Sequence, residues 1–223
     1  SNKKKISVIG LGSMGYGIAQ SLVRSGYIVY GQDINSAQQQ KLIEEGGAKE
    51  SISFDLLDAV FIVVLNDKQT RDILFGEDGI AKKLRKGALI IVCTTVSPAF
   101  AKEMAINSNS YGLFYLDAPI SGGSLKSSQG KLSYMISGSN EAYKLAKPIL
   151  EATSETIFEF GETPGAGSAM KAVNQMLAGV HIAAMAEALT FGITQGIEPK
   201  RFLEVISKCA GSSWMLENRA PHI

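Results

Sequence analysis

Cysteine is scarce in this sequence, and its scarcity argues against two classes of protein. Only Cys93 and Cys209 occur among the 223 residues, far apart and outside any CxxC or Cys/His cluster. A disulfide framework needs several paired cysteines, and a structural zinc site needs closely spaced Cys and His ligands. We therefore expect two reduced thiols in the protein core and no metal site.

An excess of charge of either sign is also absent. Lys and Arg together number 22 and Asp and Glu number 21, which gives a formal net charge of +1. No broad electrostatic field then favours nucleic acid or an anionic membrane surface. We expect neither nucleic acid nor a membrane as a partner.

Targeting and membrane-spanning signals are missing as well. No charged stretch followed by an apolar run and a small-residue cleavage site opens the sequence, as a secretion signal would require. The longest apolar stretch, residues 176–193, is interrupted by His181 and Glu187, which favours a buried helix over a membrane span. We therefore expect a cytoplasmic protein.

What is present, over residues 5–161, is an alternation of short β-branched runs with amphipathic stretches, which is typical of parallel βα units. Ser, Asn and Asp at helix starts can accept hydrogen bonds from the free N–H groups of the first turn. The predicted fold is α/β, with a doubly wound, mostly parallel sheet. The expected strands are residues 6–9, 28–32, 59–64, 89–92, 113–116, 132–136 and 157–160, with helices beginning near Ser13, Asn35, Asp67, Ser97 and Asn140.

This pattern changes at the Gly- and Pro-rich segment 161–167. No strand pattern follows it; one long helix and a second helix from Pro199 to about Lys208 are expected instead. We therefore predict two domains, residues 1–163 and an all-helical part at residues 164–223. The second is small for an independent core, so we expect it either to pack against the first domain and a partner subunit or to be incomplete at its C-terminal end.

The first loop carries a dinucleotide-binding fingerprint. Gly10-Leu11-Gly12-Ser13-Met14-Gly15 follows a predicted strand and opens a predicted helix. Its glycines permit a tight turn, close approach of the backbone to a pyrophosphate, and packing of the helix on the strand. In this context the GxGxxG pattern predicts a Rossmann domain.

Asp33, about 20 residues further on, ends the second predicted strand. A carboxylate there can bond the ribose hydroxyls and repels a 2′-phosphate, and no Arg follows closely. The sequence therefore predicts NAD rather than NADP. The alternative for Asp33 is a solvated carboxylate at a strand end.

Polar residues follow two further strands, at Leu65-Asn66 and Thr94-Thr95. Ligands of open α/β sheets bind beyond the carboxyl ends of the strands, so these residues are candidates for contacts with the same cofactor. They can equally be helix caps or turn formers.

Two further groups of residues are candidates for catalysis or substrate binding. Lys171, Asn174 and Gln175 share one face of the long helix, which is otherwise small or apolar, and a lysine there needs a partner or a ligand. The alternative is a lysine that extends to a domain edge. The segment 117–124 offers the Ser121 hydroxyl and unshielded glycine amides, which suit a carboxylate; alternatively it is a plain connection.

Three motifs together resemble those of the 3-hydroxyisobutyrate dehydrogenase family of β-hydroxyacid dehydrogenases. They are residues 9–15, residues 117–123, and Gly165-Ala166-Gly167 with Lys171 and Asn174, in the order and spacing of the family. The resemblance implies an oxidoreductase that transfers a hydride between NAD and a small hydroxy acid. It also implies a homo-oligomer, a dimer or tetramer, with a chain longer than this one.

Within the family, residues 181–184 and 210–219 are most similar to the L-threonate dehydrogenase branch. This similarity implies a four-carbon sugar acid such as threonate as substrate. A substrate like 3-hydroxyisobutyrate or tartronate semialdehyde is the alternative within the family. A 6-phosphogluconate-type dehydrogenase, or a non-catalytic reader or scaffold built on the same fold, is the alternative outside it.

The resemblance also assigns roles to residues. Lys171 is implied as the catalytic acid/base and Trp214 is expected to close one side of the pocket, or else to lie in a core or subunit interface. The implied substrate contacts are Ser121, Gly122, Gly123, Asn174 and Gln175. The expected cofactor contacts are Gly10, Leu11, Gly12, Ser13, Met14, Gly15, Asp33, Ile34, Leu65, Asn66, Thr70 and Thr95.

Overall fold

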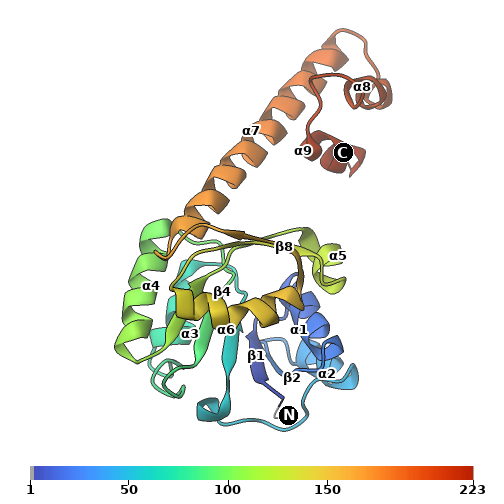
Figure 1. Cartoon of the computed structure of the whole chain (residues 1–223). Coiled ribbons are helices and arrows are strands. Elements are labelled where there is room, and N and C mark those ends of the chain that lie inside the picture. The colour runs from blue at the N-terminus through green and yellow to red at the C-terminus, as the bar shows by residue number, and fades with distance from the viewer. Residues whose placement is uncertain (1–2, 223) are drawn as a thin grey trace. The chain divides into compact units, whose positions relative to one another are not determined.

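Five short strands form the central sheet, and every pair in it is parallel (Figure 1). Their order is β2-β1-β3-β4-β5. From β1 the chain goes to β2 at one edge of the sheet, crosses back to β3 on the other side of β1, and continues from there to β5 at the opposite edge. The point between β1 and β3 is therefore the place where this kind of sheet binds ligands. The strands are β1 (Lys5–Ile9), β2 (Ile28–Gln32), β3 (Ala59–Ile62), β4 (Leu89–Val92) and β5 (Phe114–Asp117).

Both faces of this sheet are covered, as its apolar strands require. Alternate residues of β3 enter different cores: Phe61 packs in one apolar cluster, whereas Val60 and Ile62 pack in the other. Asn35, Asn66 and Ser97 cap their helices through side-chain oxygens, close to the predicted helix starts. The helical segments between the strands are α1 (Gly15–Arg24), α2 (Ser36–Glu44), η1 (Phe54–Leu56), α3 (Asp67–Phe75) and α4 (Pro98–Ser110).

A second, three-stranded sheet follows β5, which the sequence did not predict. It has the order β6-β7-β8, with β6 and β7 antiparallel and β7 and β8 parallel. A strand as short as β6 has no recognisable hydrophobic period, so the sequence did not reveal it. Without β6 the remaining strands were predicted to form a single sheet. The elements are β6 (Ile120–Ser121), α5 (Gly123–Ser128), β7 (Leu132–Ile136), α6 (Asn140–Glu151) and β8 (Ser154–Glu159).

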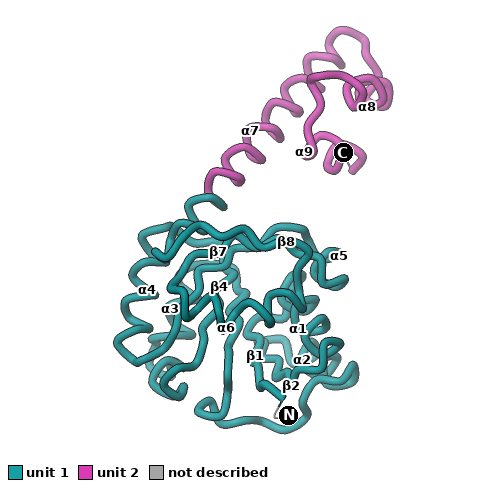
Figure 2. The backbone as a smooth tube through the Cα atoms, viewed as in Figure 1, with its two compact units in different colours: residues 1–171 teal, residues 172–223 magenta. Residues whose placement is uncertain are grey.

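This computed structural model describes residues 3–222, and the chain divides into two compact units, one ending at Lys171 and one beginning at Ala172 (Figure 2). The division falls eight residues beyond the predicted domain boundary. The first turn of the long helix therefore belongs to the first unit, because it is hydrogen-bonded to the sheet through Asp117.

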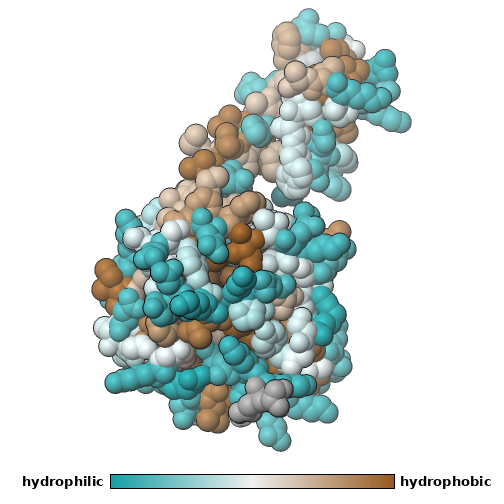
Figure 3. Space-filling model, in the orientation of Figure 1, coloured by the Kyte–Doolittle hydropathy of each residue, from teal (hydrophilic) through white to brown (hydrophobic). Residues whose placement is uncertain are grey.

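The second unit is helical, with a small core of Met185, Phe202 and Leu216. Cys209 of this unit is exposed, so the expectation of a core thiol is wrong for Cys209 and right for Cys93, which is buried. Helix α7 is long and apolar enough to cross a membrane, but only 11% of its most apolar window is buried, so the expected buried helix is largely exposed in this chain. Apolar residues are visible along α7 in Figure 3. The elements are α7 (Ala166–Thr194, shared with the first unit), α8 (Pro199–Ile206), α9 (Trp214–Arg219) and η2 (Ala220–His222).

Candidate functional site

A cavity of about 940 Å³ lies beside the β1–α1 loop, at the point between β1 and β3 where the sheet order reverses. Its volume is at the upper end of the range for small-molecule pockets. Eight of the predicted cofactor contacts line it: Gly10, Gly12, Ser13, Met14, Gly15, Asp33, Ile34 and Leu65.

The three glycines of the loop differ in what surrounds them. A Cβ on Gly10, which has φ +96°, would overlap the carbonyl oxygen of Val63, and a Cβ on Gly15 would overlap the carbonyl oxygen of Gly10. These two glycines are therefore required by the fold itself. A Cβ on Gly12 would meet no protein atom within 4 Å. Gly12 instead leaves open space in front of the backbone, as close approach of a pyrophosphate requires.

Asp33 is fixed at the wall of this cavity by two backbone N–H groups. Its Oδ2 accepts from Leu11 N at 2.7 Å and its Oδ1 accepts from Asn35 N at 2.7 Å. Each oxygen retains a lone pair for a hydroxyl donor, so the carboxylate can bond a ribose. Leu11 itself is not among the cavity residues: its side chain is fully buried, and its amide is bonded to Asp33.

Of the predicted cofactor contacts that follow β3 and β4 in the chain, one lines the cavity and two stabilise the start of α3. Leu65 is 86% exposed at the cavity, and an apolar side chain in that position suits a flat ligand ring. The Asn66 side chain accepts from Gln69 N at 2.9 Å, and the Thr70 hydroxyl donates to Asn66 O at 3.0 Å, so both stabilise the start of α3. Thr95 is exposed, and like Asn66 and Thr70 it is not among the residues that line the cavity.

The cavity is also lined by residues that no sequence motif indicated. From α3 they are Gln69, Asp72 and Ile73, whose spacing of three and four residues places them on one helix face. That spacing was visible in the sequence, but nothing marked which face of α3 meets the cavity. The others are Ile9, Gln32, Gln39, Val63 and Val64.

The candidate substrate loop begins at Ser121, which is half-buried at the end of β6. Gly122 and Gly123 follow with φ of +136° and +77°, and both residues are exposed. A hydroxyl and two backbone N–H groups in successive residues are the kind of donors that can bind an anion.

Helix α5, which follows this loop, lies against the cofactor-side helix α1. The Ser127 hydroxyl donates to Met14 O at 2.5 Å, and the Ser21 hydroxyl donates to Ser127 O at 3.1 Å. A Cβ on Gly17 would lie 2.5 Å from Ser127 Oγ, so glycine is needed for this approach. The loop that carries Ser121 is thus directly connected to the helix that begins at the dinucleotide loop.

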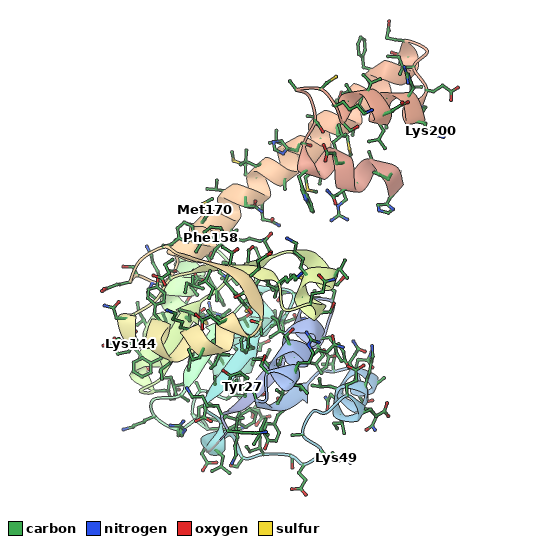
Figure 4. All side chains as sticks on the ribbon, turned by 45° about the vertical axis from the view of Figure 1, so that its right-hand side comes forward. Tyr27, Lys49, Lys144, Phe158, Met170 and Lys200 are labelled. Carbon is green, nitrogen blue, oxygen red and sulfur yellow. The ribbon has the colours of Figure 1, made fainter. Side chains whose placement is uncertain are left out.

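Lys171 is buried, with 8% of its surface exposed, whereas its neighbour Met170, which Figure 4 labels, is 38% exposed. Among residues 3–222 the Lys171 amine has no ion pair and no hydrogen bond. Burial without a compensating charge lowers the pKa of Lys171 below its usual value of 10.5. A lysine that is largely buried and has a lowered pKa is suited to exchange a proton with a ligand.

The remaining predicted substrate contacts fall in the second unit. Asn174 and Gln175 follow Lys171 on α7, and Asn174 Nδ2 donates to Gln175 Oε1 at 3.3 Å. Trp214 opens α9, and its side chain is 69% exposed. Within residues 3–222, no group of three His, Cys, Asp or Glu side chains is arranged to hold a metal ion.

Two family models match almost the whole chain. The NAD binding domain of 6-phosphogluconate dehydrogenase matches residues 5–161. The domain described as NAD-binding of NADP-dependent 3-hydroxyisobutyrate dehydrogenase matches residues 165–223. Both descriptions agree with the open space at Gly12 and with the cavity beside it.

Curated relatives and a solved structure agree with these models. The L-threonate dehydrogenases of Cupriavidus necator and Haemophilus influenzae are 43% and 42% identical, and the aligned region covers 99% and 98% of this chain and 75% and 74% of theirs. The crystal structure of 3-hydroxyisobutyrate dehydrogenase from Salmonella typhimurium matches with a TM-score of 0.92 at 40% identity, over 99% of this chain and 78% of that one. The chain therefore belongs to the 3-hydroxyisobutyrate dehydrogenase family of NAD-binding oxidoreductases.

Proposed function

We propose that this oxidoreductase is an NAD-dependent β-hydroxyacid dehydrogenase that acts on a four-carbon sugar acid such as L-threonate. The observation that carries the proposal is Lys171, a buried residue whose amine has no protein partner among residues 3–222, at the start of a helix bonded to the carboxyl edge of the sheet. The names of the 40–43% identical relatives support the choice of substrate.

Lys171 is the acid/base in this proposal. When NAD is bound, it supplies the acceptor for the hydride that leaves the substrate carbon. The substrate hydroxyl must lose its proton in the same reaction, and a base within about 3 Å is needed to take it. A neutral Lys171 amine accepts that proton, and the lowering of its pKa by burial favours this form over the charged one. In the reverse direction the Lys171 ammonium polarises the carbonyl and returns the proton.

The other proposed substrate contacts orient the hydroxy acid. The Ser121 hydroxyl and the amides of Gly122 and Gly123 hold the carboxylate, because these donors are accessible and an anion satisfies them. Asn174 and Gln175 follow Lys171 by three and four residues on α7, and we propose that they bind the substrate hydroxyls. Trp214, an exposed indole, is proposed to close the pocket or to lie in a subunit interface.

For the cofactor we propose NAD over NADP, on the basis of the fixed Asp33 carboxylate in the cavity wall. Asn66 and Thr95 come shortly after β3 and β4, whose carboxyl ends lie on the ligand-binding edge of this kind of sheet, and Thr70 lies on α3. These three residues and the backbone of Leu11 remain proposed contacts. The further proposed contacts are Gly10, Gly12, Ser13, Met14, Gly15, Ile34 and Leu65, all of which line the cavity.

The organisation of the complete enzyme is also proposed. We place the functional boundary between the Rossmann domain and the helical domain at residues 163/164, since the two family models meet within residues 161–165. We propose a cytoplasmic homo-oligomer, a dimer or tetramer, in which the exposed apolar side chains of α7 are covered.

A panel of hydroxy acids tests the proposal. L-Threonate, 3-hydroxyisobutyrate, glycerate (the reduced form of tartronate semialdehyde), L-serine and 6-phosphogluconate are each offered with NAD and with NADP, and reduced nicotinamide is followed by absorbance. We expect the highest kcat/KM with threonate and NAD. Threonamide, which lacks the carboxylate, serves as the matched control and should not be turned over. Binding of NAD without oxidation of any hydroxy acid would contradict the proposal and favour a non-catalytic protein.

A further inference from the structure

Asp117, the last residue of β5, is a fully buried carboxylate that the proposed mechanism does not use. Its Oδ1 accepts from the Ser168 hydroxyl at 2.6 Å. Its Oδ2 accepts from Ser168 N at 2.8 Å, from Gly165 N at 3.1 Å and from the Ser137 hydroxyl at 3.2 Å. Three of these four donors belong to the segment in which α7 begins.

The first N–H groups of a helix have no partner inside the helix and need an acceptor from elsewhere. In α7 that acceptor comes from a strand end about fifty residues earlier in the chain, and the Ser137 hydroxyl adds a bond from Gly167 N at 3.0 Å. A negative charge is also favourable at this end of a helix. Asp117 therefore acts as a cap that joins α7 to the carboxyl edge of the sheet.

Close backbone contacts fix the same turn from two other elements. A Cβ on Gly167 would overlap Met135 O on β7. Gly165 has φ +105°, and a Cβ there would lie 2.7 Å from Pro98 O at the start of α4, next to the Lys102 side chain. Together, β5, β7 and α4 hold the beginning of α7. The ionisable side chains in these contacts are those of Asp117 on β5 and Lys102 on α4.

Lys171 follows Ser168 by three residues, which places the two on neighbouring positions of one helix side. The Lys171 amine has no ion pair or hydrogen bond of its own among residues 3–222. Its position therefore depends on the hydrogen bonds that fix the first turn of α7 to Asp117. Burial raises the pKa of Asp117 and lowers that of Lys171. Burying a carboxylate costs folding free energy, and a neutral side chain could accept hydrogen bonds from the same N–H groups at a lower cost.

We propose that Asp117 is a positioning residue for the reaction: by binding Ser168 and Gly165 it sets the place of the first turn of α7, and hence of the Lys171 amine. The effect on catalysis rests on the proposed function, whereas the placement of the amine does not. Asp117 touches neither substrate nor cofactor in this scheme, and it acts only through the helix.

The test compares Asp117→Asn with Asp58→Asn as a matched control. Asp58 is also a carboxylate that joins separate segments, because it accepts from Lys5 N at 2.8 Å and from Arg85 Nη2 at 2.5 Å. It precedes β3, however, and so lies at the opposite end of the strands from the candidate site. Loss of either carboxylate should lower the melting temperature, and only the loss of Asp117 should affect Lys171.

Two readouts separate positioning from stability. The first is the pH dependence of Lys171 acetylation by acetic anhydride, measured by mass spectrometry of its peptide in the full chain. In Asp117→Asn we expect its midpoint to move to higher pH, because a displaced amine becomes more solvated. The second is steady-state kinetics, in which we expect kcat to fall by about a hundredfold, as a displacement of about 1 Å can produce, with an unchanged Kd for NAD.

A lowered melting temperature with a parental Lys171 titration midpoint and parental kcat would overturn the proposal, because Asp117 would then be structural in the way Asp58 is. If Asp117→Asn does not fold, Ser168→Ala carries the same test, with smaller shifts in the same directions. If the parent protein oxidises no hydroxy acid, the proposed function fails while the acetylation midpoint still decides whether Asp117 places Lys171.

Discussion

At the scale of single residues, Asp33 shows how much of a site a sequence can reveal. Its distance from the dinucleotide loop predicted its place at the end of β2, and the structure puts it in the cavity wall. The sequence could not show that both of its oxygens are already bonded to Leu11 N and Asn35 N. Those bonds depend on how β2 is placed beside the β1–α1 loop, which only the folded sheet determines.

Asp33→Ala is expected to narrow the preference for NAD over NADP. The variant loses a hydrogen bond between a carboxylate and the ribose, a contribution of about 1.5–3 kcal/mol, and with it the repulsion of a 2′-phosphate. NAD affinity should therefore fall by roughly ten- to a hundredfold, whereas NADP affinity falls less or rises. Titration calorimetry with both cofactors measures this. Asp72→Ala, on the same cavity, controls for the loss of a negative charge, and equal binding of NAD and NADP by the parent would refute the assignment.

Lys171→Ala is expected to lower kcat by several orders of magnitude with the fold and NAD binding intact. The loss combines proton transfer, about 10²–10⁴-fold, with stabilisation of the developing charge, about 3 kcal/mol. Lys171→Arg should not restore turnover, because a guanidinium does not give up its proton. Steady-state kinetics beside a thermal melt makes the comparison, with Lys144→Ala on α6 as the matched control (Figure 4).

The parent enzyme should also show the pH dependence of a neutral amine. Oxidation needs the deprotonated Lys171, so kcat rises as the pH is raised through the Lys171 pKa. Since burial lowers that pKa, the rise should occur below the usual value of 10.5. Near-normal turnover in Lys171→Ala would end the case for this lysine as the acid/base.

At the scale of elements, the sequence predicted those whose pattern is local. The strands at residues 28–32, 89–92 and 132–136 have the predicted bounds, and the helices after Asn35 and Ser97 begin as predicted, because their caps act within three residues. β6 and α9 are too short to show a period, and neither was predicted. The cap of α7 joins residues about fifty positions apart, so no local pattern could indicate it.

The start of α7 gives a prediction about glycine. Gly167→Ala puts a methyl group into the space of Met135 O, and overpacking of this kind costs about 1–3 kcal/mol, or roughly 2–12 °C in melting temperature. We expect kcat to fall as well, because the same turn leads to Lys171. Differential scanning calorimetry and kinetics measure both effects.

Gly179→Ala is the matched control for that variant, on the same helix. A Cβ on Gly179 meets no atom within 4 Å. Alanine should therefore stabilise the helix by about 0.5–1 kcal/mol, since glycine loses more conformational entropy on folding. If Gly167→Ala is as stable as Gly179→Ala, the contact with β7 does not constrain the start of α7.

At the scale of the whole molecule, composition predicted the class of protein, but it did not predict that the apolar side chains of α7 are exposed. The balance of charges and the apolar share of 45% pointed to a folded protein without a nucleic-acid surface, and the α/β fold and the family agree with a folded enzyme. A long apolar helix is expected to be buried, yet on α7 Met170, Val173, Leu177 and Val180 are 38–56% exposed. Their spacing of three or four residues places them on one face of the helix.

We expect this face to be covered by a partner subunit or by a longer chain, because an apolar helix face of this extent is unfavourable in water. Sedimentation velocity should show a dimer or larger assembly, and Val180→Glu, which puts a charge into the face, should shift it toward the monomer. Lys200→Glu, an exposed substitution on α8, should leave the assembly unchanged (Figure 4). A parent monomer that binds a hydrophobic dye would mean that the cover comes from a longer chain. A stable parent monomer that binds no dye would contradict the expectation, because the apolar face would then need no cover.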